Sequence, residues 1–484
     1  MYAHMEGVPA RTAMGGLTWM MGVALLALAP VAAAADAGGS PDSILTVASA
    51  VPSTNPTAPT IEANVVLPGT VPASSSESAG LQYFRPRDFG GLNMFEAPKE
   101  DTGTFEGKKL FWGFGFAQQF QGLKHRNTAD PKPVGTPAVN ANQLIEIGNG
   151  FNNANANLYL DAQIAHGMRV ALTAYLSSRH HTETWVKDGY LQIDASPVDI
   201  DALKAIMEHL TLRVGHFEVN YGDAHFRRSD NGNAFFNPFV GNLILDAFTT
   251  EIGAEAYART GGFLAMAGVT GGEIRGQVQK PKERSASYLG KLGYDRQLTQ
   301  AVRMRLTGSF YTNKQAVSST LYTGSRAGSR YYSVLENVQS TESAQAWSGD
   351  VQPGFKNRVT AWVVNPFVKV RGLELFGNIE QAKGRTTGEL TDRTWNQYAG
   401  EGLYRFFDEK LYVGGRYNVA EGALAGITGD VKVERMQGAG GWFVTPNVLA
   451  KIEIVRENYL RFPASDIRNG GRFDGFMIEG AVNF

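Results

Sequence analysis

The residues of this chain that could act on a charged solute are gathered in one long segment. Segment 220–247 contains the run YGDAHFRRSDNGNAFFNPFVGNLILD, in which Arg227 and Arg228 lie close to Asp223 and Asp230. Guanidinium and carboxylate groups at such spacing can bind or steer ions, and the apolar residues that follow could pack against a wall. Irregular segments of this length in ordered proteins are usually functional or disordered. This segment is therefore the first candidate for a functional site.

More basic residues stand at alternate positions of other segments. Arg303 and Arg305 share one face of a strand-like pattern and, with Arg213, are the best candidates for a basic patch. Arg416 and Lys451 occupy the equivalent face further along the chain. Acidic residues on these faces are nearly as numerous as the basic ones. Many of the charges could therefore pair across neighbouring strands and have only a structural role in the sheet. Both interpretations, a charged lining and a set of structural pairs, remain open.

The histidines and cysteines do not indicate a metal site or a catalytic centre. His180 and His181 are adjacent in an expected loop, and His216, His225 and Asp223 lack a metal-ligand spacing. The chain has no cysteine, which excludes thiolate ligands, thiol nucleophiles and disulfides. No Ser/His or paired-acid motif is recognisable either. We therefore expect no metal, no cofactor and no enzymatic activity.

Strands are the elements that must position these charges. Segment 155–164, NANLYLDAQI, alternates polar and apolar residues, and 168–177, MRVALTAYLS, repeats the pattern after the short connection AHG. Alternation over two such segments joined by a tight connection predicts a β-hairpin. About sixteen segments of this kind are present, the others being 109–121, 184–195, 208–219, 248–259, 262–279, 285–295, 302–313, 355–367, 371–383, 394–406, 410–420, 432–445, 448–458 and 472–484.

The length of the strands and of their connections predicts how they are arranged. A tilted strand of about ten to twelve residues can cross a bilayer, whereas the strands of soluble sheets have about five or six residues. Short connections between the strands alternate with long ones. The long connections include about 125–151, 220–247, 314–354 and 459–471. Transmembrane barrels show this asymmetry between their rims. The sequence predicts an all-β fold, a transmembrane antiparallel up-and-down β-barrel of about 16 strands with a long third extracellular loop.

The C-terminal end supports a closed barrel. The final run GRFDGFMIEGAVNF alternates apolar residues with a second face and ends on the aromatic Phe484. Since hydrocarbon tolerates no open sheet edge, we expect this last strand to pair with the first. One short-side connection, ASPVDIDALKAIMEHL, is expected to form a small amphipathic helix that caps the rim. A secreted β-sandwich or β-helix is the alternative, although no short repeat supports the β-helix.

The regions before the barrel have different compositions. Residues 1–35 contain an apolar core followed by small residues, which predicts a signal peptide for Sec-type export, cleaved before Asp36. Residues 36–107 form a Pro/Ser/Thr-rich periplasmic segment that we expect to be mostly disordered, because 36–80 has too little apolar surface to fold. Residues 108–484 form the expected outer-membrane barrel.

Together these features resemble Gram-negative outer-membrane porins, in which a final strand ending in Phe is a common signal for barrel insertion. Within that group, the run LRVGHFEVNYGD followed by a long loop resembles the phosphate-selective porin O/P-like superfamily. The likeness covers roughly residues 105–484. It implies a homotrimer of sixteen-stranded barrels, inserted by the barrel-assembly machinery into outer-membrane lipid.

A passive diffusion channel for small hydrophilic solutes or ions is the function that this interpretation favours. In sixteen-stranded porins the third extracellular loop folds into the lumen, and we expect 220–247 to form such a constriction; a surface loop at a trimer contact is the alternative. The expected pore-lining and constriction residues are Arg213, Arg227, Arg228, Asp223, Asp230, Arg303, Arg305, Arg416 and Lys451. Because basic and acidic residues nearly balance, only a modest anion preference is expected.

Two other classes of function stay open. A structural barrel could anchor the envelope through residues 36–107 as a periplasmic tether. An outer-membrane enzyme is a further alternative, for which no motif is found. With 45 basic and 46 acidic residues, the chain has a net charge of −1, so we expect no nucleic-acid partner.

Overall fold

The computed structural model describes one compact part of the chain. It describes residues 81–99, 103–152, 154–177, 184–228, 230–272, 281–323, 328, 330–341 and 348–484. All of these belong to the unit that spans 67–484. The expected signal peptide, the segment 36–80 and the adjacent His180 and His181 lie outside the described residues.

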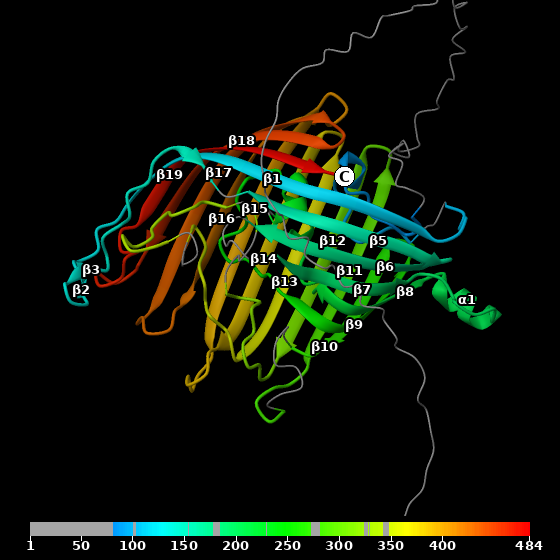
Figure 1. The fold of residues 1–484 in the computed structure, drawn as a ribbon, viewed down its shortest axis with the longest axis horizontal. Coiled ribbons are helices and arrows are strands. Elements are labelled where there is room, and N and C mark those ends of the chain that lie inside the picture. The colour runs from blue at the N-terminus through cyan, green and yellow to red at the C-terminus, as the bar shows by residue number, and fades with distance from the viewer. Residues whose placement is uncertain are drawn as a thin grey trace, which may run out of the picture. The chain divides into compact units, whose positions relative to one another are not determined.

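Strands of the described residues form one antiparallel sheet that closes on itself (Figure 1). The sheet has 17 strands, of which β4 (Gly150–Phe151) has 2 residues and continues the line of β5 beside β1. The long strands are β1 (Lys109–Arg126), β5 (Asn155–Ala165), β6 (Met168–Ser177), β7 (Thr184–Ile193), β8 (Leu210–Glu218), β9 (Thr250–Thr260), β10 (Phe263–Thr270), β11 (Ser287–Thr299), β12 (Val302–Asn313), β13 (Arg358–Val370), β14 (Leu373–Arg385), β15 (Arg393–Phe406), β16 (Leu411–Ala423), β17 (Asp430–Thr445), β18 (Val448–Leu460) and β19 (Arg472–Asn483). The predicted barrel of sixteen strands is confirmed.

The barrel closes through the pairing of β1 with β19. Their register runs from Gly115 opposite Asn483 to Arg126 opposite Arg472. The chain end extends the seam, because Phe114 N–H donates to Phe484 O at 3.0 Å and Phe484 N–H donates to Phe114 O at 3.1 Å. An unpaired backbone group in hydrocarbon costs several kcal/mol, which explains why the terminal residues are ordered and apolar outward.

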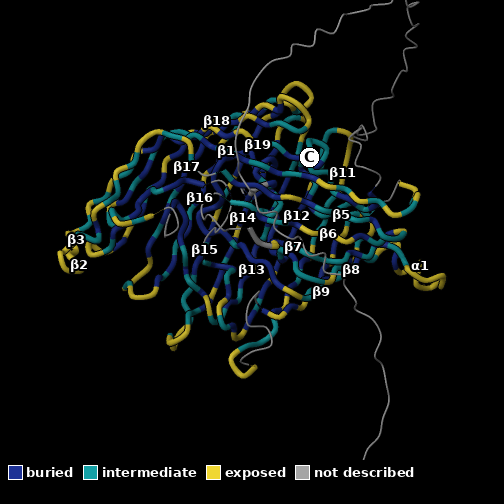
Figure 2. Tube along the Cα trace, viewed as in Figure 1, coloured by how far each residue is buried: buried dark blue, intermediate teal, exposed yellow. Residues whose placement is uncertain are grey.

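Side chains alternate between an apolar outer face and an inner face that is largely polar. On β18, Ile452 is 50% exposed and Ile454 is 68% exposed, whereas the intervening Glu453 is 0% exposed. On β5, Leu158 points outward and Asp161 is buried inside. In Figure 2 the longest exposed stretches lie in the connections, and buried positions recur along the strands between less buried ones. Exposed apolar side chains recur all around the outside of the barrel. This outer face is the surface that lipid would cover.

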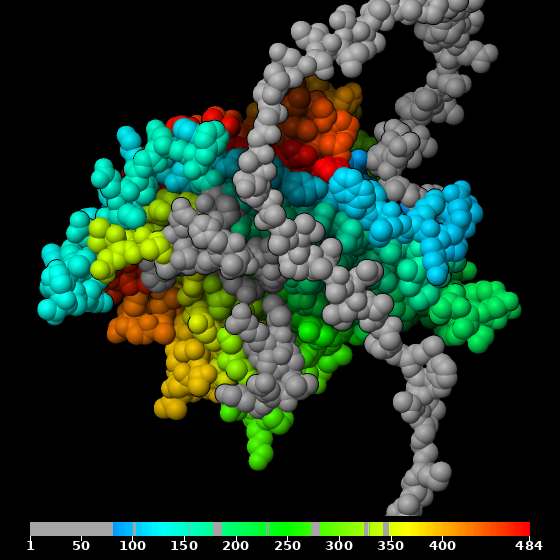
Figure 3. Space-filling model, viewed as in Figure 1, coloured from blue at the N-terminus to red at the C-terminus, as the bar shows by residue number. Residues whose placement is uncertain are grey.

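The two rims differ as the sequence predicts. Short connections join β5 to β6, β9 to β10, β11 to β12, β13 to β14, β15 to β16 and β17 to β18, and we call their side the turn rim. Long connections lie at the opposite loop rim, where the hairpin of β2 (Pro133–Val134) and β3 (Val139–Asn140) projects (Figure 3).

The predicted helix between β7 and β8 is present on the turn rim as α1 (Asp201–Met207). Of its residues only Met207 is buried, and Ile206 is 55% exposed. The helix therefore projects from the rim and does not cap it. No helix among the described residues is long and apolar enough to cross a membrane.

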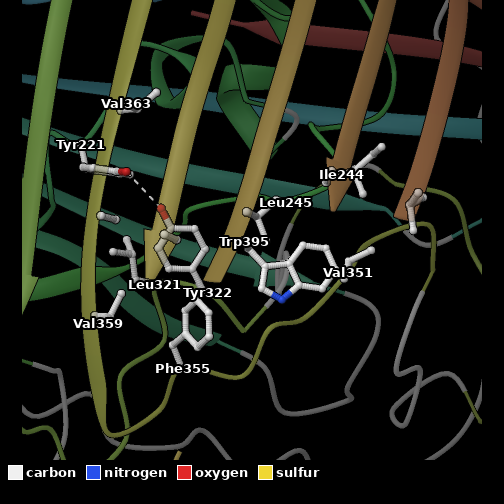
Figure 4. Packing of buried hydrophobic residues seen from close by; sticks show 14 of the residues in the cluster. Tyr221, Ile244, Leu245, Leu321, Tyr322, Val351, Phe355, Val359, Val363 and Trp395 are labelled. Carbon is white, nitrogen blue, oxygen red and sulfur yellow. Dashed lines mark hydrogen bonds between the residues drawn. The ribbon is translucent and has the colours of Figure 1, made fainter. Parts of the chain in front are cut away.

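Three segments enter the barrel and fill much of it. We call residues 81–99 the inner segment, the described residues of 219–249 the lumen loop and the described residues of 314–357 the second loop. In the loop-rim half, apolar residues of the two loops form one cluster with the wall (Figure 4). Tyr322 donates a hydrogen bond of 3.1 Å to Tyr221, which joins the two loops within this cluster. The sequence indicated a water-filled interior, but this half is packed with apolar side chains, because each loop turns its apolar run inward.

The inner segment is an ordered part of the region 36–107, which was expected to be mostly disordered; residues 36–80 of that region lie outside the described residues. Phe89 N–H donates to Pro446 O at 2.8 Å, and the Phe89 ring packs against Phe443 at 4.8 Å. Gly91 is required here, because a Cβ atom at this position would lie 2.0 Å from Pro86 O. The segment 81–99 is held by aromatic and basic residues, which 36–80 lacks.

An arginine placed on the outer face tests the membrane assignment of that face. We expect Ile454→Arg, in the middle of β18, to lower the free energy of unfolding by about 2–4 kcal/mol, since it would put a charge at the bilayer midplane. Leu390→Arg is the control, because Leu390 is 92% exposed in the connection between β14 and β15. Urea unfolding in phospholipid vesicles measures both; equal effects of the two substitutions would contradict a lipid-facing β18.

Candidate functional site

The lumen loop lies inside the barrel and is bound to its wall by polar side chains. Val240 N–H donates to Glu453 Oε2 at 2.9 Å, and Ile244 N–H donates to Asn418 Oδ1 at 3.1 Å. Leu245 and the side chain of Gln397 exchange two hydrogen bonds of 2.7 Å. These wall residues belong to β18, β16 and β15, so the loop crosses the interior along several strands. Backbone groups buried in this way need such partners.

Two of the expected pore-lining residues fasten this loop. Lys451 Nζ donates to the carbonyl oxygens of Ala234, Asn237 and Phe239 at 2.8, 2.9 and 3.1 Å, and lies 2.6 Å from Glu479 Oε1. Arg416 donates to Gly241 O at 2.6 Å and to Asn242 O at 3.2 Å. Both side chains are buried. Their charge holds the loop and is not presented to an open lumen.

The lumen loop also approaches the wall where only glycine fits. A Cβ atom on Gly232 would lie 1.6 Å from the hydroxyl oxygen of Tyr159 on β5. Asn483, on the closing strand β19, donates to Gly232 O at 3.1 Å. The loop therefore contacts the seam of the barrel as well as the opposite wall.

Asp223 is the centre of a buried charge cluster. Arg305 holds it with two hydrogen bonds of 2.8 and 2.9 Å, and Lys291 Nζ lies 2.8 Å from Asp223 Oδ1. Arg305 also lies 2.8 Å from Glu96 of the inner segment. Burial opposes the charge of Asp223, yet Lys291 and Arg305 lower its pKa to about 2. Burial likewise opposes the charge of Glu96, while Arg305 and Lys291 hold its pKa well below its usual value.

The other charged residues of the lumen loop are paired too. Arg227, in the 3-10 helix Ala224–Arg227, lies 3.3 Å from Glu401 Oε2, and Arg416 lies 3.2 Å from the other oxygen of the same carboxylate. Arg228 lies 3.3 Å from Asp246 within the loop, and Asp230 pairs with Lys187 of β7. The alternative that the sequence left open, structural pairing of the charges, thus applies to most of them.

The inner segment crosses the turn-rim half of the barrel. Arg87 Nη2 lies 2.7 Å from Asp161 on β5, Phe95 lies 5.6 Å from Phe367 on β13, and Lys99 donates to Leu210 O at 2.7 Å. The segment thus contacts strands on different sides of the interior. It narrows this half, as the two loops narrow the other.

Cavities remain between these segments. One of about 590 Å³ lies at the turn rim beside Arg303, Arg305 and His209. Another, of about 200 Å³, lies between the inner segment, the lumen loop and Arg213. Two cavities of about 20 Å³ each lie around Arg228 on the far side of the lumen loop. Neighbouring cavities share lining residues, and those beside the lumen loop around Arg228 are the smaller ones.

The structure divides the expected basic patch. Arg303 and Arg305 line the turn-rim cavity, where Arg303 is paired with Asp295 at 2.8 Å. Arg213 lines the other cavity, 3.6 Å from Glu255 and 4.7 Å from the ring of Tyr190. The residues that come together are Arg305 with Asp223, and Arg227 with Arg416.

Sequence reasoning missed the contribution of the inner segment. Arg85, Arg87 and Glu96 line the 200 Å³ cavity together with Lys187. The signal that could have found them is the run FRPRDFGG, in which aromatic and basic residues appear directly after a stretch without Lys or Arg. His225 Nε2–H donates to Asn220 Oδ1 at 2.9 Å. No group of three His, Cys, Asp or Glu that could hold a metal occurs in the described part of the chain.

The chain is similar to solved bacterial barrels, although no family model and no curated protein matches it. OmpF of Salmonella typhi is 12% identical over 79% of this chain and 99% of its own, with a TM-score of 0.47. An anion-selective porin from Comamonas acidovorans is 10% identical over 78% and 100%, with a TM-score of 0.47. The outer-membrane channel DcaP of Acinetobacter baumannii is 10% identical over 79% and 99%, with a TM-score of 0.45. Identity this low says nothing about the solutes of this chain.

Removing a buried cation that fastens the lumen loop should destabilise the protein. We expect Lys451→Met to lower the free energy of unfolding by about 3–5 kcal/mol, because Glu479 would lose this buried counter-ion. Lys432→Met is the control, since Lys432 pairs with Glu434 in a partly exposed position and should cost less than about 1 kcal/mol. Urea unfolding in vesicles measures the difference, and equal costs would contradict the fastening role of Lys451.

The stability that Asp223 contributes should depend on pH in one direction. A carboxylate whose pKa falls from 3.8 to about 2 on folding stabilises the protein above pH 4 and loses this effect as the pH falls towards 2. We expect Asp223→Asn to cost about 2 kcal/mol at pH 7, with the gap from the parent chain constant down to about pH 5 and closing below about pH 4. Unfolding curves between pH 7 and pH 2 measure this gap. A gap independent of pH would show that the charge of Asp223 does not contribute.

Proposed function

We propose that this chain forms a passive diffusion channel for small hydrophilic solutes or ions in the outer membrane of a Gram-negative bacterium. The observation that carries the proposal is a closed barrel with an apolar outer face and with charged inner side chains around interior cavities of about 590 and 200 Å³. The lumen loop and the inner segment would form the constriction. Because nearly every charge on this path has a partner of opposite sign, only a modest anion preference is proposed.

Further parts of the proposal rest on the sequence. Residues 1–35 would direct Sec-type export, and the apolar C-terminal strand with Phe484 would be read by the barrel-assembly machinery. The resemblance to phosphate-selective porins of the O/P-like superfamily implies a homotrimer. No catalytic activity is proposed, and hydrolysis of lipid or peptide substrates by the pure protein would contradict this.

A structural barrel that anchors the envelope is the second candidate. The apolar cluster between the two loops favours it, since this cluster fills the loop-rim half where a wide channel would be open. In this case residues 36–80 would be the tether. Binding of peptidoglycan by the pure protein, lost on deletion of 36–80, together with the absence of any conductance, would replace the channel by this function.

Conductance across a planar bilayer tests the constriction. We expect the full chain to form small channels, and deletion of 224–233 from the lumen loop or of 81–99 to raise the single-channel conductance, because each removes material from the interior. Deletion of 134–138 in the exposed β2–β3 hairpin is the control and should leave the conductance unchanged. Unchanged conductance in both interior deletions would contradict the constriction.

The selectivity of the same channels is measured by their reversal potential in a salt gradient. Paired charges leave little net field in the lumen, so we expect a weak preference for chloride over potassium. Clear cation selectivity would contradict the proposed lining.

A further inference from the structure

The cavity of about 200 Å³ beside the inner segment has an unusual charge balance. It is enclosed by the inner segment, the lumen loop and strands β5 to β9, and has room for on the order of six water molecules. Six Lys or Arg side chains line it against three carboxylates. Lys187 and Arg213 also pair with carboxylates behind the lining, Asp230 and Glu255. The excess of positive charge therefore lies with Arg85, Arg87 and Arg169.

Arg85 is the clearest part of this excess. Its one hydrogen bond in the described part of the chain goes from Nη2 to Phe226 O at 3.4 Å, and no carboxylate there pairs with it. The guanidinium lies 4.3 Å from the ring of Phe236, which compensates only part of its lost hydration. Burial lowers the pKa of Arg85 to about 10, so it remains charged at neutral pH. Arg85 is half-buried, and a cation that loses part of its hydration without a carboxylate in contact is destabilised, so an anion in the cavity would stabilise it.

Arg87 and Arg169 add to the excess because they share one carboxylate. Arg87 lies 2.7 Å from Asp161 Oδ2, and Arg169 pairs with the other oxygen of the same side chain. Both guanidinium groups also pack over the ring of Phe84, at 5.0 and 5.4 Å. Two cations thus face one anion on the wall of the cavity, and guanidinium groups in such an arrangement match the geometry of a carboxylate.

The remaining lining indicates the body of the anion. Rings of Tyr190, Tyr257, Phe95, Phe226 and Phe236 surround the cavity. Aromatic walls suit an apolar or aromatic body, whereas a bare inorganic anion gains nothing from them. We infer that this cavity binds a small organic carboxylate with an apolar or aromatic body, and that Arg85 and Arg87 of the inner segment complete the site. The inference rests on the proposed channel function, since it names the class of solute that would bind in this cavity during its passage.

Equilibrium binding to the full chain in detergent micelles tests the site without requiring conduction. The probes are benzoate, its neutral counterpart benzamide, and inorganic phosphate, each followed by equilibrium dialysis. We expect benzoate to bind, and benzamide and phosphate to bind at least about 10-fold more weakly, because one lacks the charge and the other the ring. Equal binding of benzamide would overturn the role of the charge, and tighter binding of phosphate would overturn the carboxylate class.

Substitution of Arg85 identifies the residue that completes the site. Arg85→Gln should weaken benzoate binding about 10-fold or more, while Arg371→Gln, at an exposed turn-rim position, should leave it within about 2-fold. Without benzoate, Arg85→Gln should not lower the melting temperature, because it removes a half-buried charge that forms no ion pair in the described part of the chain. A lower melting temperature with unchanged benzoate affinity would show a purely structural role and overturn the site.

The two proposals fail in different experiments. Conductance without benzoate binding would overturn the site and leave the channel in place. Benzoate binding without conductance would leave the site in place and overturn the channel. Deletion of 81–99 should abolish benzoate binding and raise the conductance, and retained binding in this variant would overturn the part assigned to the inner segment.

Discussion

Backbone hydrogen bonding across the seam between β1 and β19 is the constraint on which the rest of this structure depends. A sheet that faces hydrocarbon cannot leave an edge unpaired, so the first and last strands meet and the chain end at Phe484 is part of the seam. Closure separates an outer face from an interior. Alternation along each strand then sends the charged side chains inward, where they need partners of opposite charge or backbone acceptors.

The loops that enter the barrel provide partners for many of the charged side chains on its inner face. Lys451 and Arg416 donate to carbonyl oxygens of the lumen loop, and Asp223 of the loop accepts from Arg305. The loop in turn presents its apolar run to the wall and to the second loop, so that the polar wall and the apolar cluster hold the same segment. The charges that hold the lumen loop are neutralised by their partners. Few of them are therefore left to interact with an ion in the lumen. Arg85 stands apart because it forms no ion pair with a carboxylate in the described part of the chain, although Glu96 acts on it from a greater distance.

The sequence predicted the strands well because alternation is a local property. The pattern in NANLYLDAQI places Asp161 inside and Leu158 outside, as the structure has them. The same reasoning located the lumen loop, since its length and its place after the fifth long strand are visible in the sequence. Sequence reasoning does not determine the face of an aromatic residue such as Phe443, which lies near a strand end, is 3% exposed and packs inside against Phe89. Aromatic residues near strand ends occur on both faces, and their type alone does not distinguish the two.

The sequence by itself determined the alternation, the approximate number of strands, the asymmetry of the rims and the apolar closing strand. Only the tertiary structure decided which charges meet, because partners such as Arg305 and Asp223, or Arg87 and Asp161, lie far apart in the chain and come together only when the barrel closes. It also decided that the inner segment occupies the interior. The inner segment contacts wall residues from many strands. No local pattern in residues 81–99 predicts these contacts, which offset the conformational entropy lost when the segment becomes ordered.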